Sequence, residues 1–434
     1  MKIQWFIRFS IILFCVILSA CGGGSSGKAV DTSEAPEAGG ESAHSIGSNQ
    51  YTSIEMQANL ADLEYTRIST AEFVEKYFQL STQTSSTQFM ISNDQTFVIP
   101  ENTISFSLNF FNPLAGSDLY MVELENPSGD KIDLQDLIPC FSEFCSMVMP
   151  NRPQELYRPE VGTWKYRVVA EKSVVERQGL GVASLNLYIR TTTDGQKPDE
   201  NGPSVATLTV QPFYTGSDIS GDYITSVMNS FVGLFARNYV AIEFKPAIHI
   251  TDERFSSIVP DYTHEKTQQM LQYGKASDVN LYFVRTFDFG LDSSSGYQEH
   301  PRMDKETRTL LGIAPGIPGS LGKKGSGNGV LIGLGSGDGD SYALRSSSYN
   351  AKVAAHEVGH FLGLFHTTEG SGGVDVLEDT PICKLGEDSG VLPDAAECPD
   401  GTNLMFPYVR SDGVPQEVIT EHQRFVIYNS PLAH

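Results

Sequence analysis

An eleven-residue stretch that begins at His356 reads H-E-V-G-H-F-L-G-L-F-H and constrains this chain more than any other. Residues four apart share one face of a helix, so His356 and His360 can direct two imidazoles at one ion. Gly363 can adopt a positive φ, which ends the helix and lets His366 return as a third nitrogen ligand. Glu357 follows the first ligand, where its carboxylate can reach a metal-bound water. Three protein ligands and an open fourth position predict a catalytic zinc site; the alternative is an amphipathic core helix whose histidines align by chance.

The segments that follow resemble the metzincin peptidases, in which the extended motif precedes a methionine turn beneath the metal. Met405 stands in such a segment, the run Asn-Leu-Met-Phe-Pro at 403–407. The run Asp-Val-Leu-Glu-Asp-Thr-Pro at 375–381, with its flanking cysteines, is similar to the pappalysin family of metzincins. Pappalysins usually carry a tyrosine two residues after the methionine, whereas here Tyr408 comes one residue later, a pattern closer to the matrixins. The resemblance covers the chain from about residue 204 to the C-terminus.

The resemblance implies a zinc-dependent endopeptidase that hydrolyses extracellular or envelope proteins, with Met405 as a packing floor under the metal. Zinc lowers the pKa of a bound water from 15.7 towards about 7. Glu357 would then act as general base and pass the proton to the leaving amine. The alternative function is a surface lipoprotein that binds glycan or protein through its N-terminal half, with peptidase activity secondary or absent.

The N-terminus predicts export. Lys2 and Arg8 precede or flank an apolar run, at 9–16, that is too short to span a bilayer. The sequence Leu-Ser-Ala-Cys that ends at Cys21 resembles a bacterial lipobox, which implies cleavage before Cys21, acylation of that cysteine and, by analogy, an outer-membrane or cell-surface location. An ordinary signal peptide cut near Ala20 is the alternative. Residues 21–50 are rich in glycine, serine and acidic residues and predict a flexible tether.

Export favours disulfides. Cys140, Cys145, Cys383 and Cys398 remain after the signal and the acylated cysteine are set aside, and four cysteines allow three pairings. Proximity in sequence favours Cys140–Cys145 and Cys383–Cys398.

A formal net charge of −23 argues against nucleic acid and against docking on anionic lipid, so the lipid anchor is the expected membrane contact. Protein or peptide substrates are the expected partners of a monomer. The acidity leaves room for Ca²⁺, for which Asp375 and Asp379 are candidates, although Asp379 could instead brace its segment through hydrogen bonds.

The expected fold is an N-terminal all-β sandwich-like accessory domain, residues 51–193, followed by an α/β metzincin catalytic domain, residues 204–434, with a mixed sheet and an active-site helix. Short aromatic or β-branched runs predict strands in the first part, after one helix at 71–80. In the second part a strand at 208–214, a helix through 224–235 and a buried strand at 279–287 are expected. A strand at 329–335 could pair with an extended substrate at a sheet edge. The accessory domain could be a pro-region, a binding module or a spacer.

Overall fold

The computed structural model describes most of the chain after residue 63. The ranges are 64–71, 73–74, 89–92, 94–111, 119–132, 144–153, 159–171, 183–191, 206–262, 264–275, 278–288, 310–320, 327–336, 342–369, 375–386, 392–410 and 414–433. The predicted export signal, Cys21, the tether and the linker at 194–203 lie outside them. Within these ranges, no helix combines the length and the apolar character needed to cross a membrane.

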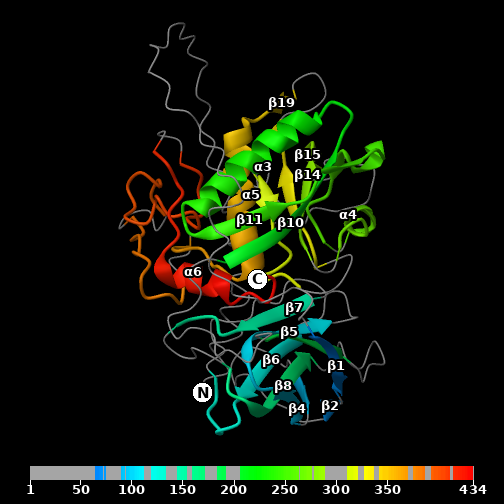
Figure 1. Ribbon diagram of the computed structural model, residues 1–434, viewed down its shortest axis with the longest axis vertical. Helices are drawn as coiled ribbons and strands as arrows, with labels where there is room; N and C mark the ends of the chain where they lie inside the picture. Colours follow the sequence, from blue (N-terminus) through cyan, green and yellow to red (C-terminus); the bar gives the residue numbers. More distant parts are fainter. Residues whose placement is uncertain are drawn as a thin grey trace, which may run out of the picture.

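Two antiparallel sheets make up the described N-terminal half (Figure 1). One has the strand order β1 (Glu64–Ala71), β9 (Ala183–Thr191), β5 (Thr103–Phe111), β7 (Phe144–Met149). The other has the order β2 (Phe73–Val74), β3 (Phe89–Ser92), β8 (Gly162–Glu171), β4 (Gln95–Ile99), with β6 (Leu119–Glu125) also paired to β8. Phe97 on β4 lies opposite Trp164 on β8, and both rings contact Phe106 on β5 of the other sheet, at 5.4 and 5.3 Å between centroids. Alternate apolar residues thus give the two sheets a shared aromatic core.

The prediction of a helix at 71–80 is wrong for its first residues. Ala71 ends strand β1, and Phe73 and Val74 form β2, which pairs with β3. Phenylalanine and valine are strand formers, and this pairing overrides the helical spacing. Residues 75–80 lie outside the described part of the chain.

A six-stranded sheet forms the centre of the C-terminal half. Its order is β11 (Val240–Phe244), β10 (Ala206–Thr215), β14 (Val279–Val284), β17 (Val330–Gly333), β16 (Gly312–Ile313), with β12 (Ile248–Ile250) also paired to β10. All pairs are parallel except β16 with β17. Every residue of β14 is buried because both faces of the sheet are covered, as its continuous apolar run predicted.

The strand predicted at 329–335 does not lie at the edge of the sheet, as the sequence analysis expected. The segment expected at 329–335 contains β17, which lies between β14 and β16 and is therefore internal. The two-residue strand β16 occupies the edge instead. It is too short to show a period-two pattern in the sequence.

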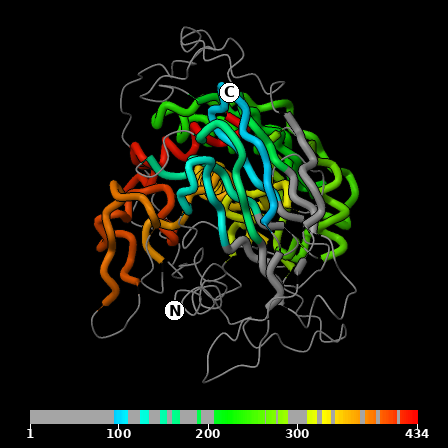
Figure 2. Tube along the Cα trace, turned by 90° about the horizontal axis from the view of Figure 1, so that it is seen from below, coloured from blue at the N-terminus to red at the C-terminus, as the bar shows by residue number. Residues whose placement is uncertain are grey.

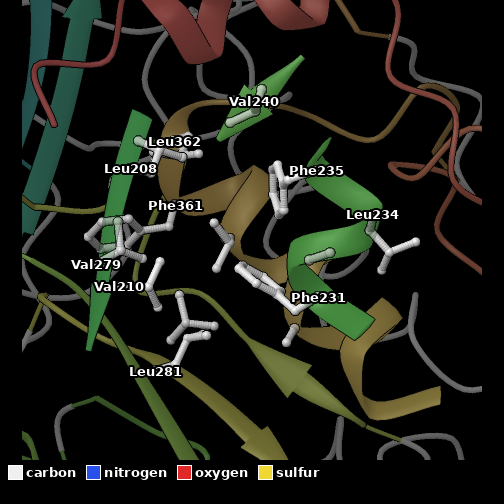
Figure 3. Packing of buried hydrophobic residues seen from close by; sticks show 14 of the residues in the cluster. Leu208, Val210, Phe231, Leu234, Phe235, Val240, Val279, Leu281, Phe361 and Leu362 are labelled. Atoms are coloured by element: carbon white, nitrogen blue, oxygen red, sulfur yellow. The ribbon is translucent and has the colours of Figure 1, made fainter. Parts of the chain in front are cut away.

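Helices cover the two faces of this sheet. α3 (Gly221–Ala236) and α5 (Ser347–Leu362) pack on one face, where Phe231, Phe235 and Phe361 join the apolar side chains of β10 and β14 (Figure 3). α4 (Glu265–Leu271) packs on the other face with the short elements η2 (Glu253–Phe255), β13 (Ser257–Ile258) and β15 (Thr286–Phe287). The hairpin β18 (Gly335–Ser336) and β19 (Ala343–Leu344) leads into α5, and α6 (Glu421–Tyr428) lies near the C-terminus. α5 thus packs against both α3 and the sheet, and most of its residues are buried.

The two halves touch through buried side chains, and the N-terminal strands lie across the C-terminal half when it is viewed from below (Figure 2). Arg190 of β9 is 3% exposed and donates to the carbonyls of Tyr428, at 2.5 Å, and Ser430, at 3.4 Å. The hydroxyls of Ser146 and Ser320 are 3.1 Å apart. Burial lowers the pKa of Arg190 to about 10, because the charged guanidinium loses its hydration in the contact between the two halves.

Candidate metal centre

Helix α5 positions the first two histidines. Ser346 caps its N-terminus by accepting from the backbone N–H of Tyr349 at 3.2 Å. Gly363 ends it with φ 110°, and its N–H reaches back to the carbonyl of His360. This left-handed glycine is the turn that the motif predicted, and it returns the chain so that His366 faces the helix.

The structure brings the three predicted histidines together. The Nε2 atom of His366 lies 3.1 Å from the Nε2 atoms of both His356 and His360. The three side chains are 7%, 5% and 2% exposed for His356, His360 and His366. Among the described residues they form a group whose ligand atoms all lie within 4.8 Å of one another.

The hydrogen bonds at Nδ1 determine which nitrogen carries the proton in His356 and His360. Nδ1 of His356 lies 2.8 Å from the carbonyl of Leu404, and Nδ1 of His360 lies 2.7 Å from that of Leu364. A carbonyl only accepts, so both Nδ1 atoms carry protons and both Nε2 atoms are bare in the neutral rings. Two lone pairs therefore point at Nε2 of His366, an arrangement that calls for a cation between them.

The spacing of the nitrogens fits zinc. A tetrahedral ion about 2.0–2.1 Å from each imidazole holds two of them about 3.3 Å apart, close to the separations observed. Three nitrogen donors with no sulfur and no protein carboxylate among them are a ligand set that zinc accepts in catalytic sites.

Burial sets the pKa values of these rings. It lowers the pKa of His356 to about 3, and the His366 ring adds to this while the Leu404 carbonyl opposes it. Burial, followed by the other two rings, holds the pKa of His360 well below its ordinary value. For His366 burial also acts downward, but the charge and hydrogen bond of Glu369 outweigh it and raise its pKa. His356 and His360 are thus neutral at pH 7, as ligands must be, and a metal would displace any proton on His366.

Glu369 was not singled out from the sequence. Both of its carboxylate oxygens lie 3.0 Å from Nδ1 of His366, and the residue is 7% exposed. A carboxylate at this position orients the ring and raises its basicity towards a metal. The signal available in the sequence was an acid three residues after the third histidine.

Glu357 lies beside the histidines and is 3% exposed. Its side chain packs against Gly312 of the edge strand β16: a Cβ at that glycine would lie 2.6 Å from Cγ and 3.1 Å from Oε1 of Glu357. His356 and Glu357 line the same hollow, which opens beside the centre. The carboxylate is therefore confined next to the ligands, and Gly312 supplies the space that it needs.

Met405 lies under the helix, fully buried, where a Cβ on Gly359 would collide with its sulfur. Its N–H donates to Oδ1 of Asn403 at 2.8 Å, and Asn403 exchanges amide hydrogen bonds with Gln423 at 2.9 and 3.2 Å. Gln423 in turn forms the capping box of α6 with Thr420. This chain of contacts fixes the turn whose Leu404 carbonyl orients His356.

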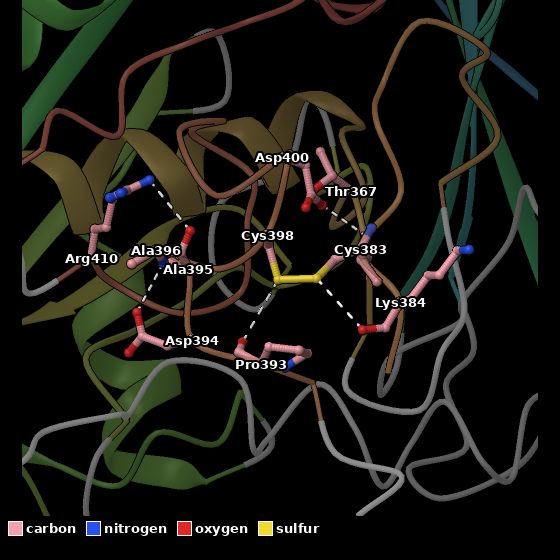
Figure 4. The surroundings of a disulfide bond; sticks show 11 residues. Thr367, Cys383, Lys384, Pro393, Asp394, Ala395, Ala396, Cys398, Asp400 and Arg410 are labelled. Atoms are coloured by element: carbon pink, nitrogen blue, oxygen red, sulfur yellow. Dashed lines mark hydrogen bonds between the residues drawn. A yellow bond between two sulfur atoms is a disulfide. The ribbon is translucent and has the colours of Figure 1, made fainter. Parts of the chain in front are cut away.

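The predicted disulfide Cys383–Cys398 is confirmed, and it joins cysteines that lie 15 positions apart (Figure 4). Asp400 beyond it accepts from the hydroxyls of Thr367 and Thr368, at 2.7 and 2.8 Å, directly after His366. The disulfide and Asp400 therefore hold the segment that follows the third histidine in place. Cys140 and the side chain of Cys145 lie outside the described residues.

The two candidate calcium residues occupy different places. Asp379 accepts from Thr420 Oγ1 at 2.8 Å and from the N–H of His422 at 2.9 Å, so it makes the bracing hydrogen bonds considered as the alternative. Asp375 accepts from Thr380 Oγ1 at 2.6 Å, but its other oxygen is buried without a hydrogen bond. Burial raises the pKa of Asp375 to about 7. Calcium at these residues stays a prediction.

Comparison with known proteins adds a second line of evidence, although the chain matches no protein-family model. It is 28% identical over 138 residues to proteins named extracellular metalloprotease from Arthroderma benhamiae and Trichophyton verrucosum, over 31% of this chain and 42% of each relative. It is 31% identical over 129 residues to one from Pyricularia oryzae, over 27% of this chain and 38% of that relative. The chain is similar to extracellular metalloproteases. It spans about two-fifths of their length, and their name implies a metal, for which the histidine group is the candidate.

Among solved structures, a bacteriophage CBA120 tailspike protein 4 domain aligns with a TM-score of 0.14 and 13% identity, over 32% of this chain and 20% of that chain. This likeness carries no conclusion about the fold.

Proposed function

We propose that this chain is an exported zinc metalloendopeptidase of the metzincin type, most similar to the pappalysins, with a β-sandwich-like accessory domain and a lipid anchor at Cys21. The observation that carries the proposal is the convergence of three imidazole Nε2 atoms beside a buried carboxylate. The similarity to fungal extracellular metalloproteases supports the metal-dependent activity and the export.

His356, His360 and His366 would hold the ion. When bound there, zinc supplies Lewis acidity that makes water easier to deprotonate near neutral pH and polarises a peptide carbonyl. The acceptors at the outer nitrogens keep all three Nε2 atoms directed inward, so the ligands need little reorganisation.

Glu357 would move the proton. Its carboxylate takes a proton from the attacking water, whose oxygen adds to the carbonyl carbon, and gives the proton to the nitrogen as the carbon–nitrogen bond breaks. Gly312 leaves room for this carboxylate in the lining of the hollow, beside His356, where the substrate peptide would bind.

The Glu357→Gln variant tests this role. It should keep one zinc per chain and lose about 10²–10⁴-fold in turnover of a casein-type substrate, because the ligands survive and the general base does not. The matched control is Glu378→Gln, which changes an exposed carboxylate a few residues before Cys383. This variant should retain activity. Parent-like turnover by Glu357→Gln would show that another group transfers the proton.

A further inference from the structure

A hollow that is open to solvent lies beside the metal centre. His356 and Glu357 form part of its lining, so a side chain that enters it belongs to a residue next to the scissile bond.

Most of the lining is apolar. It includes Leu311, Val353, Leu404, Phe406, Pro407 and Val409. Gln416 also lines the hollow, but its amide donates to the carbonyls of Tyr408, at 2.9 Å, and Phe406, at 3.5 Å, and accepts from the N–H of Arg410 at 3.1 Å. These bonds fix the wall and occupy the amide.

Lys352 contributes a positive charge to the lining of this hollow. It stands one helical turn before His356 on α5, is half-buried, and forms no ion pair with any carboxylate of the described residues. Burial lowers the pKa of Lys352. A half-buried ammonium in a mostly apolar lining gains from a counter-ion that enters with a ligand, because the low local dielectric strengthens the pair.

We propose that this hollow selects a carboxylate side chain, aspartate or glutamate, at one of the two positions that flank the scissile bond, and that Lys352 pairs with it. The inference rests on the proposed peptidase function and names its substrate class. The net charge of −23 makes the molecule as a whole repel acidic peptides, so such a preference must come from a local cation.

The experiment compares zinc-loaded full-length parent with Lys352→Met, Lys352→Arg and Lys352→Glu. Each protein is given a peptide library randomised around the scissile bond, followed by peptide pairs that differ only by glutamate or glutamine at the selected position. The readout is the ratio of kcat/KM for the two peptides, which a purely structural effect on folding does not change. Lys266→Met removes a partly buried lysine of α4 outside the hollow and serves as the matched control.

The parent and Lys266→Met should prefer glutamate by about tenfold, the lower end of the range for a hydrogen bond to a charged group, because Lys352 is partly open to water. Lys352→Arg should keep the preference, Lys352→Met should bring the ratio near one, and Lys352→Glu should favour a basic residue.

Cleavage by the parent without an acidic preference at either flanking position, or a preference that survives in Lys352→Met, would overturn the inference and leave the peptidase function standing. Absence of any cleavage by zinc-loaded protein would instead contradict the proposed function, and the inference would fail with it.

Discussion

Replacing Glu369 with glutamine removes the negative charge behind the third histidine and leaves an oxygen that can still accept. In the parent both carboxylate oxygens lie 3.0 Å from Nδ1 of His366, and both residues are more than nine-tenths buried. Loss of such an outer partner typically costs 10- to 100-fold in metal affinity, or about 1.4–2.7 kcal/mol. Because glutamine preserves one hydrogen bond, we expect the lower end, about tenfold. Glu369→Ala should reach the upper end.

The assay is a competition titration of metal-stripped protein with a chromophoric zinc chelator at about pH 8, where imidazoles are largely unprotonated. Glu378→Gln, an exposed carboxylate, is the control and should bind zinc as the parent does. Equal zinc affinities for the parent and Glu369→Gln would refute the view that this carboxylate tunes the ligand.

Three further predictions concern stability. Asp375 has an ordinary pKa of 3.8 that burial raises to about 7, so in chelator-treated protein its contribution is complete below the ordinary value and is lost as the pH rises to about 7, by at most about 4 kcal/mol. Urea unfolding at several pH values should show this loss of stability, and Asp375→Asn should abolish the pH dependence. A parent whose stability does not change with pH would contradict the prediction. Calcium bound at Asp375 should stabilise the parent and not Asp375→Asn. The double variant Cys383→Ser/Cys398→Ser should lose about 3 kcal/mol of unfolding free energy, because the bonded cysteines lie 15 positions apart, and reductant should lower the stability of the parent equally. Unchanged stability would show that the disulfide does not stabilise the fold. Gly359→Ala should cost about 1–3 kcal/mol, since the added methyl meets the buried Met405, and a more stable variant would show that helix propensity prevails.

The metal ligands were predictable because the motif is local. Four-residue spacing on a helix, and a glycine that can turn the chain, suffice to place His356, His360 and His366 together before any tertiary contact is known. The regular elements were predictable for a similar reason: the apolar spacing through 224–235 corresponds to α3, and the continuous apolar run after Val279 to β14.

The surroundings of the site were not predictable, because they join distant segments. Gly312 reaches Glu357 only through the two-residue edge strand β16, and Leu404 reaches His356 only because Gln423 and its helix hold the methionine turn. Neither relation has a periodic or compositional signal. The burial of Arg190 against the C-terminal carbonyls is likewise a product of how the halves pack, since a lone arginine in a strand predicts exposure.

Zinc content and ligation measured on the same purified sample test the central claim most directly. Elemental analysis after zinc supplementation, combined with X-ray absorption at the zinc edge, should give one zinc per chain bound by three imidazole nitrogens at about 2.0–2.1 Å, and the triple variant His356→Ala/His360→Ala/His366→Ala should lose it. Protein that stays metal-free after supplementation, or zinc whose ligation survives in the triple variant, would contradict a metal centre built from these histidines.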